Sequence, residues 1–182
     1  SKPELSPAAS ETAEAEDDGV EDAKAELESE ITFLTKEGMA QMNKRQWDRA
    51  IDTFEKVQDR DPLNEDALRA LNQIKVWKKD QSSLQEAKAL RKEKAYGRAV
   101  KLLRDIDTRS TYHEDAQAEL TDLMKEKPSL MQQAEVLLSA KDCTAALKLY
   151  EQAQQLDPRD TVVGKKIQEV KALQGKRRKC KN

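Results

Sequence analysis

Helix-breaking and sheet-forming residues are scarce in this chain. Glycine and proline number five each, and aromatic residues make up only 4% of the 182 residues. The β-branched residues are too sparse and scattered for a sheet protein. The abundant residues are alanine, glutamate, lysine, leucine, arginine and glutamine, whose side chains lose little freedom in a helix. We therefore predict an all-α protein.

Histidine and cysteine, which often carry catalysis or bind metals, are also rare. The single histidine, His113, precedes a predicted helix and is expected to be a solvated side chain or a cap. Cys143 and Cys180 lack the spacing of metal ligands and are predicted to be free thiols. No glycine-rich phosphate loop is present, and no nucleophile has an evident base beside it. We expect a protein that is not an enzyme and that uses no cofactor or metal.

Long hydrophobic runs are missing as well. No apolar run approaches the length of about 20 residues that a membrane-spanning helix needs. The chain starts at Ser1 with neither a methionine nor a signal peptide, and we interpret it as an excised piece or a processed form. The compartment therefore stays open between the cytoplasm and a bacterial periplasm.

Charge is unevenly distributed although the formal net charge is only −2. Residues 1–30 hold eleven acids and two bases, whereas residues 160–182 hold eight bases and two acids. The first 20 residues are rich in alanine, serine, glutamate and proline and cannot bury enough apolar surface to fold. We predict a disordered acidic linker over residues 1–20, a helical domain over 21–175 and a basic tail over 176–182.

The helical domain contains an internal repeat. Three similar segments are anchored on Ala50, Ala99 and Ala146, which are 49 and 47 residues apart. The register holds upstream and downstream of these alanines and covers about residues 31–175. Apolar residues recur within it at three- and four-residue spacing, as a helix with one buried stripe requires.

Each repeat is predicted to hold three helices, which we name A, B and C, giving about nine helices in three repeats. Asp61-Pro62 and Asp157-Pro158 are predicted to end B helices, and Asn64 and Asp160 to cap the C helices that follow. Helix A is expected at 31–44, 81–94 and 129–140, helix B at 47–60, 96–107 and 143–156, and helix C at 64–79, 113–126 and 160–175.

Small, aromatic and proline residues at fixed positions give the repeats a family resemblance. The positions in the first repeat are Gly38, Trp47, Ala50, Phe54 and Pro62, and the counterparts in the later repeats are Ala87, Tyr96, Ala99 and Leu103, then Ala134, Cys143, Ala146, Tyr150 and Pro158. This pattern resembles the tetratricopeptide repeat (TPR) family. That family has two helices in about 34 residues, whereas helix C is an added element here. The segment 107–120 is also similar to part of the repeat proteins of bacterial envelope assembly.

The resemblance implies an α-solenoid that binds other proteins along the face formed by its A helices. Residues expected to line this face are Thr32, Thr35, Met39, Met42, Leu84, Lys88, Arg91, Met131, Glu135 and Leu138. They mix apolar groups, polar groups and both charges, which suits a bound peptide or helix.

Two functions remain open on these observations. The first is a non-catalytic scaffold or adaptor for another protein or peptide segment, forming the soluble part of a larger assembly of a bacterial envelope or secretion kind. The alternative is a protein that binds nucleic acid or anionic membranes through Lys176-Arg177-Arg178-Lys179 in its basic tail. The rest of the chain is not basic, which disfavours nucleic acid.

Overall fold

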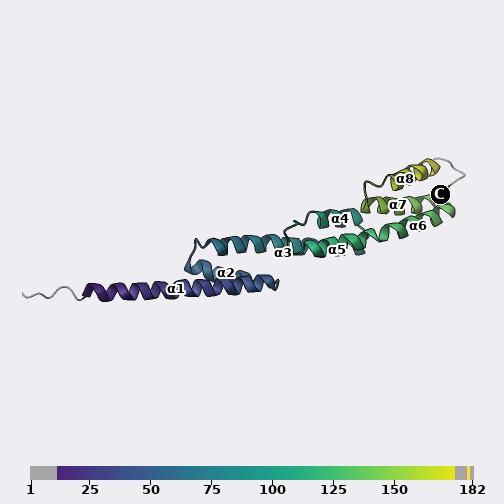
Figure 1. The fold of residues 1–182 in the computed structure, drawn as a ribbon. Coiled ribbons are helices and arrows are strands. Elements are labelled where there is room, and N and C mark those ends of the chain that lie inside the picture. Colours follow the sequence, from purple (N-terminus) through teal and green to yellow (C-terminus); the bar gives the residue numbers. More distant parts are fainter. Residues whose placement is uncertain (1–11, 175–179, 181–182) are drawn as a thin grey trace, which may run out of the picture. The chain divides into compact units, whose positions relative to one another are not determined.

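The structure is a computed structural model that describes residues 12–174 and residue 180. Within these residues every regular element is an α-helix and no strand occurs, which confirms the predicted all-α class. The helices are α1 (Thr12–Asn43), α2 (Trp47–Arg60), α3 (Glu65–Lys92), α4 (Tyr96–Arg104), α5 (His113–Met124), α6 (Glu126–Ser139), α7 (Cys143–Leu156) and α8 (Thr161–Gln174) (Figure 1).

The prediction of nine helices is wrong for the described residues, which form eight. The predicted C helix at 64–79 and the A helix at 81–94 are one continuous helix, α3. The junction between them contains neither glycine nor proline, and Asp80 at its centre is buried. Nothing in the local sequence therefore stops the helix. The corresponding junction between α5 and α6 does break, at Lys125, three residues before Pro128.

The first helix starts earlier than the sequence predicts. Helix α1 begins at Thr12, inside the segment 1–20 that we predicted as a linker, while residues 1–11 lie outside the described residues. Alanine and glutamate alternate at its start, and both favour helices, while acidic residues suit a helix N-terminus. Of the predicted basic tail, 176–182, only Cys180 is described.

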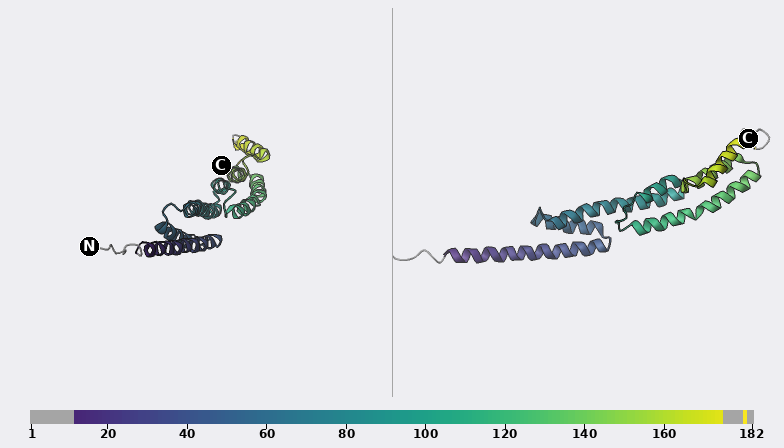
Figure 2. Two further views of the ribbon diagram at one scale, coloured as in Figure 1. Left: turned by 60° about the vertical axis from the view of Figure 1, so that its left-hand side comes forward. Right: turned by 45° about the horizontal axis from the view of Figure 1, so that its top comes forward.

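The chain divides into two compact units, Ser1–Lys75 and Val76–Asn182, and the boundary falls within α3. In the first unit α1 and α2 pack side by side (Figures 1 and 2). Phe54 of α2 is fully buried against Gly38 of α1, where an added Cβ atom would lie 2.7 Å from the ring. The Thr53 hydroxyl also donates a hydrogen bond to Gln41 Oε1 over 2.9 Å. Small and large side chains therefore alternate across a close helix contact.

In the second unit α7 is the central helix. It packs against α6 on one side and α8 on another, and it also contacts α4, which in turn packs against α5. Its side chains Tyr150, Ala153 and Leu156 are fully buried. Burial of a Leu or Phe side chain stabilises a fold by about 1.5–3 kcal/mol, so the buried side chains of α7 contribute substantially to the stability of the unit.

Three helices end in the same turn. Arg45, Lys94 and Lys141 follow α1, α3 and α6 with φ of 55°, 60° and 63°. In each case the amide of the next residue donates to the carbonyl five residues back, as Gln46 does to Gln41 over 3.0 Å. This is the Schellman arrangement, which satisfies carbonyls left free at a helix end. The three turns are spaced by the same 49 and 47 residues as the anchoring alanines.

The predicted caps and small packing positions are confirmed. Asn64 Oδ1 accepts a hydrogen bond from the Ala67 amide over 3.1 Å, and Asp160 Oδ1 accepts from the Val162 amide over 2.8 Å. The anchoring positions of the three B helices are fully buried in their own units, namely Ala50, Ala99 and Ala146.

The prediction of two free thiols is wrong. Cys143, the buried first residue of α7, is joined to Cys180 by a disulfide, and their Cα atoms are 5.5 Å apart. Trp47 and Tyr96 hold the same first position in α2 and α4 and are also buried. Cysteine spacing could not predict this pair, because it depends on the path that the chain takes after α8.

We predict opposite stability changes for two glycine-to-alanine substitutions. Gly38→Ala should lower the stability by about 1–3 kcal/mol because its methyl group would overlap the rigid Phe54 ring. Gly164→Ala, in α8, should raise it by about 0.5–1 kcal/mol, because its nearest neighbour is the flexible end of Gln154 and alanine favours the helix. Urea denaturation measures both, and equal effects would contradict the close contact.

The disulfide is expected to stabilise the second unit because it closes a loop across 37 residues of sequence. Loop closure of this kind contributes about 2–4 kcal/mol. Cys180→Ser should therefore lower the melting temperature measured by circular dichroism, and a reducing agent should lower that of the wild type alone. If oxidised wild type and the variant melt together, the disulfide does not stabilise the fold.

Candidate protein-binding surface

The structure divides the ten predicted binding residues by exposure. Four are exposed and available to a partner, namely Thr32, Met39, Lys88 and Glu135. Four are half-buried, namely Thr35, Arg91, Met131 and Leu138. The remaining two, Met42 and Leu84, are buried. The predicted face therefore straddles the border between the surface and the core.

Met42 and Leu84, which we predicted to face a partner, are buried within the fold. Met42 follows Gly38 by four residues, so it lies on the side of α1 that packs against α2. Leu84 precedes the fully buried Ala87 by three residues and shares its side of α3. Both residues belong to the apolar stripe that holds its helix in the fold.

Arg91 is held in a network of charged groups within the second unit. Its Nε atom donates to Glu126 Oε1 over 2.6 Å, and its Nη1 atom donates to Glu119 Oε1 over 3.1 Å. The Tyr96 hydroxyl donates to the other oxygen of Glu126 over 2.7 Å. The pKa of Tyr96 is raised to about 12, mainly because the hydroxyl is buried and secondly because it donates this hydrogen bond to Glu126. The four residues come from α3, α4, α5 and α6, so Arg91 joins helices rather than awaiting a partner.

Helix α6 presents three of the predicted residues, Met131, Glu135 and Leu138. Glu135 is exposed and lies 3.9 Å from the ammonium group of Lys166 on α8. Met131 and Leu138 precede and follow it and are half-buried. An exposed ion pair at this distance contributes little stability, so Glu135 can exchange Lys166 for another cation at low cost.

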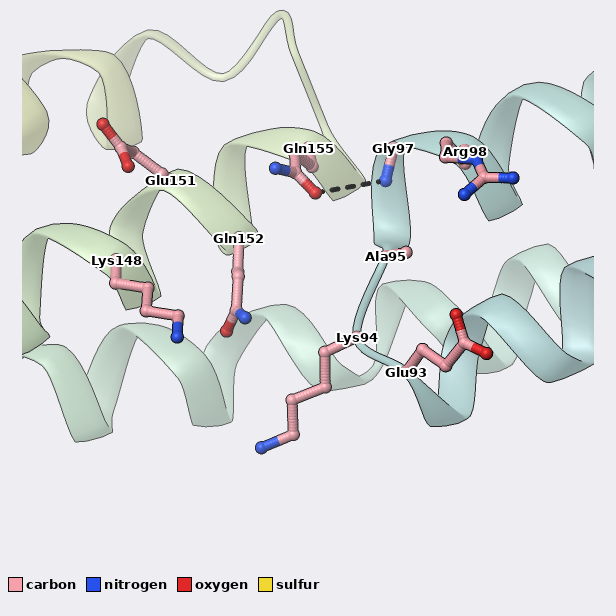
Figure 3. A pocket seen from close by; sticks show the side chains of 9 residues that line it. All are labelled: Glu93, Lys94, Ala95, Gly97, Arg98, Lys148, Glu151, Gln152 and Gln155. Carbon is pink, nitrogen blue, oxygen red and sulfur yellow. Dashed lines mark hydrogen bonds between the residues drawn. The ribbon is translucent and has the colours of Figure 1, made fainter.

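A groove lies between α4 and α7 in the same unit (Figure 3). Its volume is about 610 Å³, and at one point the Gly97 amide donates to Gln155 Oε1 over 3.3 Å. The lining residues come from the turn after α3, from α4 and from α7, and they are Glu93, Lys94, Ala95, Gly97, Arg98, Lys148, Glu151, Gln152 and Gln155.

The groove offers hydrogen-bonding groups and charges of both signs. Lys94 and Lys148 are exposed cations on its walls, and Glu151 is an exposed carboxylate whose oxygen lies 3.6 Å from the Lys171 ammonium. The side-chain oxygen of Gln152 is shielded from solvent and has no hydrogen-bond partner among the described residues. This set of groups fits the alternating donors and acceptors of a polypeptide chain.

This groove could not be predicted from the sequence. Its two walls belong to different B helices, and most of its lining residues are ordinary surface types. The groove depends on how α4 and α7 meet, and the repeat register alone does not specify that contact. The prediction placed binding on A helices, whereas the groove uses the B helices and the turn between α3 and α4.

A comparison with known proteins finds no matching family model, no similar curated protein and no similar solved structure. The described residues contain no group of histidine, cysteine, aspartate and glutamate side chains that could hold a metal ion. None of the helices described here has both the length and the apolar character needed to cross a membrane.

We predict that Arg91 and Lys88, three residues apart on α3, differ sharply in their effect on stability. Arg91→Met should destabilise the fold by about 1–3 kcal/mol, because Glu119 and Glu126 lose the cation that pairs with them. Lys88→Met, at an exposed position, should change the stability by no more than about 0.5 kcal/mol. Chemical denaturation compares the two, and similar values would show that the network is not structural.

Proposed function

We propose that this chain is a non-catalytic scaffold that binds a segment of another protein. The observation that carries the proposal is the groove between α4 and α7, with its charges of both signs. An extended segment placed there would supply side chains of opposite charge to Lys148 and Glu151. Neither a metal nor a nucleophile is needed for this role.

We propose further that the helices follow a TPR-like repeat. Three features support this arrangement: the identical turns after α1, α3 and α6, the buried alanines near the start of each B helix, and the buried Trp47 and Tyr96. A repeat protein stacks similar helix pairs and presents extended surfaces, which suits a scaffold. A larger assembly, of a bacterial envelope or secretion kind, remains our proposal for the setting.

A second candidate function is binding to nucleic acid or to an anionic membrane. The observation that favours it is the basic C-terminal end of the sequence, where Lys165 and Lys171 on α8 are exposed and residues 176–181 hold five further bases. Binding of this kind depends on charge and falls steeply as salt is added.

Site-specific photocrosslinking in the source cell tests the groove. A photoreactive amino acid in place of Gln152 should capture a protein partner, whereas the same group at the exposed Glu114 of α5 should not. Lys148→Glu should reduce capture at position 152, because it reverses a charge on the groove wall, while Lys165→Glu on α8 should leave it unchanged.

Two outcomes would contradict the proposal. Equal capture from positions 152 and 114 would show contact that is not specific to the groove. Binding that is unaffected by Lys148→Glu, but is lost in moderate salt and on replacement of Lys176, Arg177, Arg178 and Lys179 by serine with Cys180 kept, would instead support the second candidate function.

A further inference from the structure

Helix α1 extends well beyond the helix that covers it. It has 32 residues and α2 has 14, which correspond to lengths of about 48 and 21 Å. Arg60, the last residue of α2, pairs with Glu30 of α1. The contact between the two helices therefore runs from about Glu30 to the end of α1, and both figures show α1 continuing past α2 (Figures 1 and 2). Residues 20–30 of α1 are all exposed.

The apolar stripe that binds α2 continues into this exposed part. A helix turns by about 100° per residue, so Leu34, Ile31, Leu27 and Val20 all lie within about 40° of Gly38 around the helix axis. Gly38 contacts Phe54, and Leu34 and Ile31 are half-buried. Leu27 and Val20 continue the same line but are 40% and 67% exposed. The exposed stripe thus continues an established helix contact, and Lys24, which also lies within about 40° of Gly38, interrupts its apolar line between Val20 and Leu27.

Acidic side chains border the exposed stripe on both sides. By the same helical rotation of about 100° per residue, Glu21 and Glu28 lie on one side of it and Glu26 and Glu30 on the other. Residues 20–30 contain five acids and one base, Lys24, and residues 12–30 of the sequence contain nine acids and one base. A second copy of this helix would meet strong like-charge repulsion here.

We propose that residues 20–34 of α1 bind a basic amphipathic helix of another protein. The occupant would place an apolar stripe on Val20, Leu27 and Ile31 and lysines or arginines opposite Glu21, Glu26 and Glu28. The pairing of α1 with α2 provides the pattern, since α2 covers the same stripe with Phe54 and Val57 and sets Arg60 against Glu30. Apolar contact supplies the affinity, and charge complementarity selects the partner.

This surface goes beyond the proposed groove and uses different residues. Before binding, the exposed apolar side chains of this part of α1 add no stability by burial. Helical segments without tertiary contacts are only marginally stable in water. A basic helix would cover that stripe and neutralise the repulsion between neighbouring carboxylates. The free energy of binding therefore includes stabilisation of α1 itself.

The test uses the full chain and a fluorescent peptide of leucine and lysine in an amphipathic helical pattern, about 18 residues or about 27 Å long. A matched peptide carries glutamate in place of each lysine. Fluorescence anisotropy should show binding of the lysine peptide, weakening as salt is added. Val20→Ser with Leu27→Ser should raise its Kd at least about tenfold, because both apolar side chains of the exposed stripe are lost. Serine and valine have similar helix propensities, so the change at position 20 tests the contact and not the stability of the helix.

Control variants separate this surface from others. Val136→Ser with Val162→Ser removes two exposed apolar side chains from α6 and α8 and should leave the Kd unchanged. Lys148→Glu in the groove should also leave the Kd unchanged. The groove and the α1 surface can therefore be supported or contradicted separately. Glu21→Lys with Glu28→Lys should weaken the lysine peptide and strengthen the glutamate peptide.

Three results would overturn the proposal. The lysine peptide could bind no better than the glutamate peptide, or the Val20 and Leu27 substitutions could leave its Kd unchanged. Sedimentation could also show self-association that those substitutions abolish, in which case the stripe binds a second copy of the chain.

Discussion

The close approach of neighbouring helices at small residues is the constraint on which the rest of the structure depends. At Gly38 the backbone of α1 comes so near Phe54 that a single methyl group would overlap the ring. Ala50, Ala99 and Ala146 are fully buried in the B helices. Small side chains allow the larger apolar groups beside them to interlock, and close packing makes such sites intolerant of added volume. These contacts decide which side of each helix is left for binding.

The turns at the helix ends make these contacts possible without glycine. Arg45, Lys94 and Lys141 adopt positive φ, a conformation that costs about 1–2 kcal/mol for residues other than glycine. The Schellman hydrogen bonds and the packing of the following B helix compensate for that cost. The long basic side chains stay at the surface, where all three are exposed. The reversal of the chain is therefore determined by tertiary packing more than by the turn residue itself.

Much of the fold could be predicted from the sequence, because it depends on local spacing. The start of α2 at Trp47, the cap at Asn64 and the burial of Ala99 follow from apolar periodicity and turn chemistry. The site could not be predicted in the same way. Leu84 is buried and Arg91 is paired because of contacts with distant helices, and the α4–α7 groove exists only where two B helices meet. Repeat register identifies equivalent positions but not their neighbours.

The two ends of the described chain differ in whether their helices are fastened to a neighbour. Cys180 is bonded to Cys143, the first residue of α7, and Trp47 and Tyr96 hold the same first position in α2 and α4. The first position of α7 is therefore held by a disulfide, whereas the first position of α2 and of α4 is held by a buried aromatic side chain. On α1, by contrast, Val20 and Leu27 extend the packing stripe with nothing over them among the described residues. These two apolar side chains, in register with a buried stripe yet exposed, are the observation behind the helix-binding surface that we propose for α1.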